Sequence, residues 1–215
     1  MYQAILFDLD GTLTESGMGI TRSVQYALEK IGKPEENLRN LQVFVGPPLL
    51  EQFMKYAGIE EETAHQAVAY YRERYAVTGI FENCLYEGIE EMLGELKQKG
   101  YRLAVASSKP EVYVRQILEH FGIHEYFEEI VGSELNGERT RKSEVIEETL
   151  KRMKLCGRRK CVLMIGDKEH DVLGAKECGL QCVAVSYGYG TREELEAVSP
   201  LKIADSPAEI LDFFV

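Results

Sequence analysis

The chain has 215 residues, of which 45% are hydrophobic and 28% charged, and its formal net charge is −11. This length allows one or two domains with a sizeable buried core, and the composition is that of a folded protein. The negative charge argues against non-specific binding to nucleic acid or to a membrane surface. No segment approaches the roughly 20 apolar residues of a membrane span, and the first ten residues lack the basic start of a signal peptide.

The cysteines predict reduced, structural thiols. Their number is odd, no two have the C-x-x-C spacing, and no histidine follows at a zinc-site interval. Those in apolar runs should behave as small hydrophobic side chains. We therefore expect a cytoplasmic protein. The five are Cys84, Cys156, Cys161, Cys178 and Cys182.

The first predicted strand, Ala4–Phe7, is continuously apolar, as expected of a strand buried on both faces of a parallel sheet. Four further β-rich runs follow, and apolar residues at helical spacing lie between them. This alternation predicts an α/β fold, a Rossmann-like parallel sheet with helices on both faces. The further strands are expected at Arg102–Ala106, Glu129–Val131, Cys161–Ile165 and Gln181–Val185.

A second domain is predicted inside the first. The first two strands lie too far apart in the chain for one crossover helix, so residues 14–86 should form a small helical bundle inserted into a core of residues 1–13 and 87–215. The Gly46-Pro47-Pro48 segment must interrupt its helices. The apolar stripes of the bundle are Ile20, Val24, Ala27, Leu28 and Ile31, and later Ala64, Ala67, Val68 and Tyr71.

Two carboxylates, Asp8 and Asp10, directly follow the first strand, and Gly11 permits a tight turn after them. Side chains two positions apart on a strand share a face. Both acids should therefore leave the carboxyl edge of the sheet, where open α/β sheets bind ligands. A solvated turn is the alternative for an isolated Asp-Gly pair, but here the preceding strand is fully apolar.

A second pair of acids, Asp167 and Asp171, follows the fourth predicted strand. Their spacing places them on one side of the helix that begins there, and the alternative is that they serve as N-cap and first-turn acid of that helix. Four carboxylates at one sheet edge cannot all ionise unpaired. Oxygen ligands of this kind suit a hard cation such as Mg²⁺.

The D-x-D-G-T motif of residues 8–12 and the G-D-x-x-x-D motif of residues 166–171 resemble motifs of the haloacid dehalogenase superfamily of phosphohydrolases. The segment Leu103–Pro110 resembles the second motif of that superfamily, and Lys142 stands where the third motif has its lysine. The resemblance covers essentially the whole chain and implies that residues 14–86 are a helical cap. It is closest to the phosphoglycolate-phosphatase-like branch, in which 5′-nucleotidases also occur.

The resemblance implies a phosphatase that hydrolyses a small phosphomonoester, either phosphoglycolate-like or a nucleoside monophosphate. Asp8 would attack phosphorus and form an aspartyl-phosphate, while Asp10 would act as general acid and then as general base. Lys142 and Ser107 would hold the transferring phosphoryl group. The substrate-binding residues expected beside them are Ser108, Gly11 and Thr12.

The resemblance also implies Mg²⁺ as cofactor, held by Asp8, the Asp10 carbonyl, Asp167 and Asp171, the last directly or through water. With Mg²⁺ and Lys142 against four acids, about one proton should be retained, and we expect it on Asp10. Lys109 is expected either to bind phosphate or to play a structural role. Ser107 has the alternative of capping the helix that follows it.

The sequence is compatible with two other functions. A phosphomutase of the same superfamily and a non-catalytic module that binds a phosphorylated ligand are the alternatives. Segment 71–75 with Arg72 and Arg74 could close over the substrate or could be an ordinary helix face. The Gly188-Tyr189-Gly190 segment lacks the third glycine of a dinucleotide loop, so that reading is rejected. We expect a monomer or homodimer that acts on a small phosphorylated metabolite and binds neither nucleic acid nor membrane.

Overall fold

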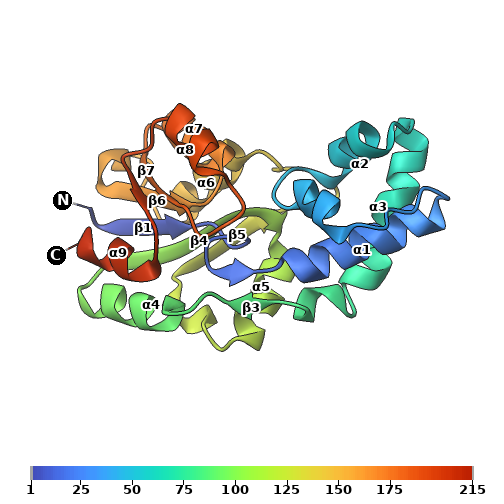
Figure 1. Ribbon diagram of the computed structural model, residues 1–215. Coiled ribbons are helices and arrows are strands. Elements are labelled where there is room, and N and C mark those ends of the chain that lie inside the picture. Colours follow the sequence, from blue (N-terminus) through green and yellow to red (C-terminus); the bar gives the residue numbers. More distant parts are fainter. Residues whose placement is uncertain (1, 215) are drawn as a thin grey trace. The chain divides into compact units, whose positions relative to one another are not determined.

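Strand β1 (Ala4–Phe7) lies in the middle of a six-stranded sheet in the computed structural model, which describes residues 2–214. All neighbouring strands of this sheet are parallel, and their order is β5-β4-β1-β6-β7-β8 (Figure 1). Phe7 is level with Val105 of β4 on one side and Ile165 of β6 on the other. The other strands are β4 (Arg102–Pro110), β5 (Glu129–Ser133), β6 (Val162–Gly166), β7 (Gln181–Val185) and β8 (Lys202–Ala204).

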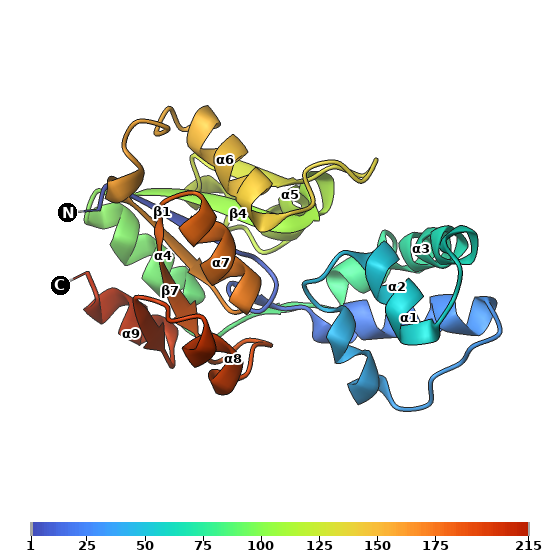
Figure 2. The same cartoon turned by 90° about the horizontal axis from the view of Figure 1, so that it is seen from above.

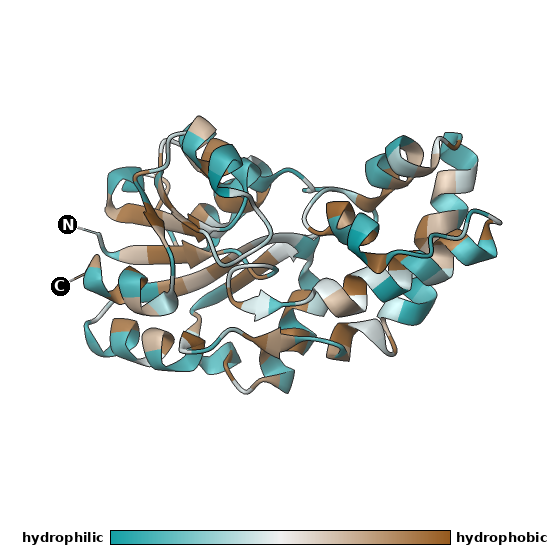
Figure 3. Cartoon of the chain, viewed as in Figure 1, coloured by the Kyte–Doolittle hydropathy of each residue, from teal (hydrophilic) through white to brown (hydrophobic). Residues whose placement is uncertain are grey.

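Helices cover both faces of this sheet, which confirms the predicted fold class (Figure 2). Right-handed crossovers place the helices that lead toward β5 on one face and those that lead from β5 back across β1 on the other. The apolar strands lie between these layers, and the polar helix faces point outward (Figure 3). The helices are α4 (Ile89–Gln98), α5 (Glu111–His120), α6 (Lys142–Arg152), α7 (Glu169–Glu177), α8 (Arg192–Ala197) and α9 (Pro207–Asp212), with short 3₁₀ turns at His124–Tyr126 and Arg159–Cys161.

The strand predictions agree with the structure except at their ends. Strands β1 and β7 have the expected bounds. Strand β6 starts one residue late because Cys161 closes a 3₁₀ turn. Strand β4 continues beyond Ala106 to Pro110. The short edge strand β8 was not predicted, because three residues with a lysine at the start carry little periodicity.

The chain divides into two compact units, one of Met1–Thr14 with Leu85–Val215 and one of Glu15–Cys84. The two-stranded ribbon of β2 (Thr14–Glu15) and β3 (Cys84–Leu85) lies where the chain passes between them. We call Glu15–Cys84 the inserted unit. It contains α1 (Gly17–Lys30), η1 (Leu38–Phe44), α2 (Leu49–Ala57), α3 (Glu61–Tyr75) and η2 (Gly79–Phe81).

The inserted unit has its own core, built mainly from the predicted stripes of α1 and α3. Ile20, Val24, Ala27 and Leu28 are buried, as are Ala64, Ala67 and Tyr71, whereas Val68 and Ile31 are only half-buried. The rings of Tyr71 and Tyr75 stack with centroids 5.1 Å apart. The Gly46-Pro47-Pro48 segment is a turn between η1 and α2. No helix among the described residues is long and apolar enough to cross a membrane.

Arg74 is engaged inside the inserted unit. Its guanidinium donates to both carboxylate oxygens of Glu82, at 2.8 and 3.1 Å, and to Ser23 Oγ at 3.2 Å. Arg22 donates to the same carboxylate at 2.7 Å. These contacts join α1, α3 and the chain after η2, so Arg74 helps to hold this unit together.

Replacing Gly19 by alanine should destabilise the protein, because a Cβ there would lie 1.9 Å from the carbonyl oxygen of Gly79. Such overpacking costs about 1–3 kcal/mol, which lowers the melting temperature by roughly 2–4 °C for each kcal/mol. The control is Gly94→Ala in α4, where the nearest atom to the added Cβ is 3.9 Å away. Alanine is preferred over glycine there by about 1 kcal/mol, so Gly94→Ala should raise the melting temperature. Similar shifts for both variants in calorimetry would contradict the close approach.

Candidate active site

Asp8 is the first residue after β1 and its carboxylate is buried. Its backbone N–H donates to the Ile165 carbonyl at 2.9 Å, which extends the pairing between β1 and β6 by one residue. Asp8 Oδ1 accepts a hydrogen bond from Lys142 Nζ at 2.8 Å. The carboxylate is therefore held at the carboxyl edge of the sheet by both its backbone and its side chain.

Lys142 is the first residue of α6 and lies between two acids. Besides Asp8 it contacts Asp171 Oδ1 at 2.8 Å, and it donates to the Ala106 carbonyl at 3.0 Å. Burial disfavours its charge, but Asp171 and Asp8 outweigh burial and raise the pKa of Lys142. The ammonium group therefore remains charged although only 4% of the residue is exposed.

Asp8, Asp167 and Asp171 form a buried carboxylate cluster, with one oxygen from each within 4.8 Å of the others. Burial, together with the charges of Asp171 and Asp8, raises the pKa of Asp167 well above its usual value. Burial also raises the pKa of Asp8. For Asp171 burial is outweighed by Lys142, which lowers its pKa. The oxygen-only donor set fits a hard divalent cation, since such a charge would offset the crowding.

Asp10 is paired with a different lysine. Its Oδ2 lies 2.5 Å from Lys109 Nζ, and its Oδ1 is buried with no hydrogen-bond partner among the described residues. The position of Lys109 beside Asp10 is compatible with either of the roles that the sequence left open. The four acids and the two lysines leave a formal charge of −2, the charge of one divalent cation. The proton expected on Asp10 stays a prediction.

Ser107 lies in β4 just before its pairing with β5 becomes irregular. Its buried Oγ accepts the Lys109 N–H at 3.3 Å, and α5 begins only at Glu111, so Ser107 does not cap that helix. Ser108 follows and is half-buried.

The turn after Asp10 packs against Asp167. Gly11 has a φ of +84°, and a Cβ on it would lie 2.1 Å from Asp167 Oδ2. Thr12 is buried, and its Oγ1 has no hydrogen-bond partner among the described residues. Asp8, Asp167, Asp171 and Lys142 thus lie together, and Gly11 packs against them.

The loop after β7 is part of the site and was missed. The Tyr189 N–H donates to Asp167 Oδ2 at 2.8 Å, and Tyr187 Oη donates to the Thr12 carbonyl at 3.0 Å. A Cβ on Gly188 would lie 2.3 Å from the Gly11 carbonyl oxygen. The sequence indicates this position, because the loop follows a strand of the parallel sheet and so leaves the same carboxyl edge as the acids. The glycines at 188 and 190 were interpreted only as a possible dinucleotide-binding loop.

In metal-free buffer at pH 7, Asp167→Asn should raise the melting temperature, because it removes one of the crowded charges and keeps an acceptor for Tyr189. The raised pKa of Asp167 means that the folded wild type binds a proton more tightly than the unfolded chain. The Asp167 carboxyl therefore adds to the free energy of unfolding as the pH falls from neutral toward about 4. Asp167→Asn lacks this group, so its stability should increase less over the same pH range. The control is Asp205→Asn, whose exposed carboxylate pairs with Arg192. A lower melting temperature for Asp167→Asn than for wild type would contradict the crowding.

Comparison with known proteins agrees with this geometry. The family model of the haloacid dehalogenase-like hydrolases matches residues 5–185. A 5′-nucleotidase of Pseudomonas aeruginosa is 49% identical over 199 residues, covering 93% of this chain and 89% of that protein. The tyrosine-protein kinase PtkA of Mycobacterium tuberculosis is 40% identical over 197 residues, 92% of this chain and 66% of that protein.

A crystal structure of a predicted phosphatase from Clostridium acetobutylicum superposes with a TM-score of 0.95 at 44% identity, covering 100% of this chain and 98% of that one. The sheet order, the acids at the carboxyl edge and the length of the match all agree with this likeness. The chain belongs to the haloacid dehalogenase-like hydrolases and is a phosphatase of that family.

Proposed function

We propose that this phosphatase hydrolyses a small phosphomonoester with Asp8 as nucleophile and Mg²⁺ as cofactor, and that a nucleoside 5′-monophosphate is its substrate. The observation that carries the proposal is the Asp8 carboxylate, buried beside two further acids and held by a charged lysine. The 49% identity to a 5′-nucleotidase supports the substrate class.

Asp8 would attack phosphorus, forming an oxygen–phosphorus bond as the bond to the leaving alcohol breaks. Water would then attack the aspartyl-phosphate and release inorganic phosphate and the free carboxylate. Lys142 supports this role because it holds Oδ1 of Asp8 and so restricts the orientation of the carboxylate.

Asp10 would protonate the leaving oxygen and later take a proton from the attacking water. Its Oδ2 is held by Lys109, whereas its buried Oδ1 has no partner among the described residues. One oxygen is therefore held and the other is available to the substrate. A buried acceptor without a partner costs free energy, so such a group is expected where a ligand completes the site.

The transferring phosphoryl group would be held by Lys142, Ser107 and Thr12, with the Ser108 amide and the Gly11 turn beside them. The Ser107 hydroxyl can donate because it accepts the Lys109 N–H. Thr12 Oγ1 is a second buried hydroxyl, and it lacks a partner among residues 2–214. Hydroxyl and ammonium donors of this kind suit phosphate oxygens.

Asp8, the Asp10 carbonyl and Asp167 would hold Mg²⁺, and the bound cation would neutralise negative charge on the phosphoryl group and the carboxylates. Asp171 would take part less directly. Its Oδ1 contacts Lys142, and its Oδ2 accepts the Lys168 N–H at 3.0 Å, so both oxygens are engaged within the protein.

The inserted unit would determine which phosphomonoester is accepted, as a cap that supplies no nucleophile.

Two alternatives within this site are a phosphomutase, which returns the phosphoryl group to its substrate, and a module that binds a phosphorylated ligand without turnover. The likeness to PtkA favours one further candidate, transfer of the phosphoryl group to a tyrosine hydroxyl in place of water.

The test is a panel of nucleoside 5′-monophosphates, phosphoglycolate and sugar phosphates with Mg²⁺, measuring released phosphate. A tyrosine-containing acceptor protein in parallel reactions reports transfer to tyrosine. We expect the highest kcat/KM for a nucleoside 5′-monophosphate. Phosphoglycolate as the best substrate would overturn the substrate class, and no release from any ester would overturn the proposed activity.

Asp8→Asn should abolish turnover, because an amide does not provide the attacking oxygen. Asp10→Asn should retain the nucleophile and lose roughly 10²–10⁴-fold in rate, the usual contribution of acid–base catalysis. Rapid-quench analysis with p-nitrophenyl phosphate should then reveal an accumulated phosphoenzyme in Asp10→Asn only. Wild-type turnover by Asp8→Asn would eliminate the proposed nucleophile.

Mg²⁺ should raise the melting temperature of the wild type, because a ligand that binds only the folded state stabilises it by mass action, about 2.7 kcal/mol at 100 times Kd. Asp167→Asn should lose most of this shift. The control Asp205→Asn keeps all the carboxylates of the site and should respond to Mg²⁺ like the wild type. If Mg²⁺ raises the melting temperature of Asp167→Asn as much as that of the wild type, Asp167 is not a ligand of the metal.

A further inference from the structure

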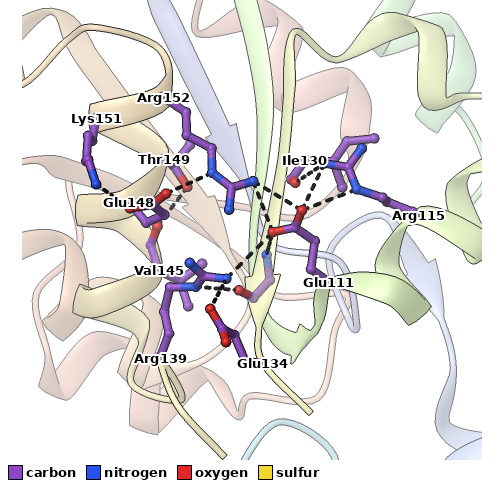
Figure 4. A network of polar contacts seen from close by, with 11 residues as sticks. Glu111, Arg115, Ile130, Glu134, Arg139, Val145, Glu148, Thr149, Lys151 and Arg152 are labelled. Atoms are coloured by element: carbon purple, nitrogen blue, oxygen red, sulfur yellow. Dashed lines mark hydrogen bonds and ion pairs between the residues drawn. The ribbon is translucent and has the colours of Figure 1, made fainter. Parts of the chain in front are cut away.

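Beside the carboxyl ends of β4 and β5, Glu111 lies among three arginines that the proposed function does not use (Figure 4). We call Glu111, Arg115, Arg139 and Arg152 the Glu111 cluster. Glu111 is the first residue of α5, Arg139 lies in the loop before α6, and Arg152 ends α6. The cluster therefore joins the segments that carry Lys109 and Lys142.

Glu111 is the shared acceptor of this cluster. It accepts from Arg115 Nη2 at 2.9 Å and from Arg152 Nη1 at 3.1 Å, and its Oε2 is 3.7 Å from Arg139 Nη2. Burial opposes its charge, but hydrogen bonds from Arg152 and Arg115 outweigh burial and hold the pKa of Glu111 below its usual value. The carboxylate is thus ionised, and it binds its own helix α5, helix α6 and the loop before α6.

Arg139 holds the loop before Lys142 in an uncommon conformation. Its backbone φ is +53°, a left-handed value that costs a non-glycine residue about 1–3 kcal/mol unless the surroundings enforce it. Its Nε donates to the Gly132 carbonyl at 2.8 Å, and its Nη2 lies 3.3 Å from Glu134 Oε1. The guanidinium thereby ties the start of α6 to the end of β5 and to Glu111.

Strand β4 needs such an anchor, because its site residues lie where the ladder to β5 is interrupted. Ala106 pairs with Val131, and the pairing resumes only at Pro110 with Ser133. Between these two pairs the chain advances by four residues on β4 and by only two on β5. Ser107, Ser108 and Lys109 occupy this irregular stretch. At its end the chains touch closely, since a Cβ on Gly132 would lie 2.4 Å from the Lys109 carbonyl oxygen.

We propose that Glu111 is a positioning residue, whose carboxylate sets the placement of Lys109, the partner of Asp10, relative to Lys142, the partner of Asp8. Glu111 directly follows the irregular stretch of β4 and is bound through Arg139 and Arg152 to the loop and helix that carry Lys142. This inference rests on the proposed roles of Asp8 and Asp10. It adds a residue whose side-chain contacts lie outside the carboxylate cluster.

Glu111→Gln tests the proposal, because the amide has the same size and lacks the charge that gathers the arginines. We expect kcat for p-nitrophenyl phosphate to fall about 10- to 100-fold, since small displacements of catalytic groups can cost roughly 10²-fold. KM should change less than about twofold, because the groups that bind the ester remain. An unchanged kcat would overturn the proposal.

The matched control is Glu128→Gln. Glu128 precedes β5 and accepts from Arg102 at the amino end of β4, at 2.7 Å, so it forms a glutamate–arginine pair away from the site. Glu128→Gln should lower the melting temperature slightly and leave kcat unchanged. An equal loss of kcat in both variants would assign the effect to general stability and overturn the positioning role.

Arg139→Gln supplies a second variant should Glu111→Gln fold poorly, and the pair completes a double-mutant cycle. If Glu111 acts through Arg139, the kcat of the double variant should be no lower than that of the more impaired single variant. If the fold-losses in kcat of the two single variants multiply in the double variant, Glu111 does not act through Arg139. Loss of turnover in Asp8→Asn with normal turnover in Glu111→Gln would refute this inference alone, whereas activity in Asp8→Asn would refute the proposed function.

Discussion

The buried ammonium group of Lys142 is the interaction on which the site depends. It is bound to Asp8, Asp171 and the Ala106 carbonyl, so it joins β1, β4, α6 and α7 at one point. Removing one partner of a buried ion pair typically costs about 3–5 kcal/mol, because the other charge is left without compensation. The same group that organises the acids therefore also holds these elements together.

The order of the sheet explains why residues so far apart in the chain meet here. Strand β1 lies between β4 and β6, and the chain reverses direction across the sheet after β5. Open α/β sheets bind ligands at such a switch point, beyond the carboxyl ends of the strands. Asp8, Ser107 and Asp167 belong to three adjacent strands or the residues directly after them.

The carboxylate cluster disfavours the charged form of two of its members. Burial and mutual repulsion raise the pKa values of Asp8 and Asp167, so each ionised carboxylate is costly without a cation. The Glu111 cluster shows the opposite balance, because three arginines surround one acid. The structure thus places a well-compensated acid next to a poorly compensated group of acids.

The sequence by itself determined the parallel sheet, the helical stripes and the acids that follow the strands, because periodicity and apolar runs are local properties of the chain. It also located the lysine at 142, through a resemblance in motif spacing. Only the tertiary structure decided the partners of these groups. The pairing of Lys109 with Asp10, the commitment of Arg74 to Glu82 and the contact of Tyr189 with Asp167 all join segments distant in sequence. Such pairs depend on how strands and loops are placed in space, and no local pattern encodes them.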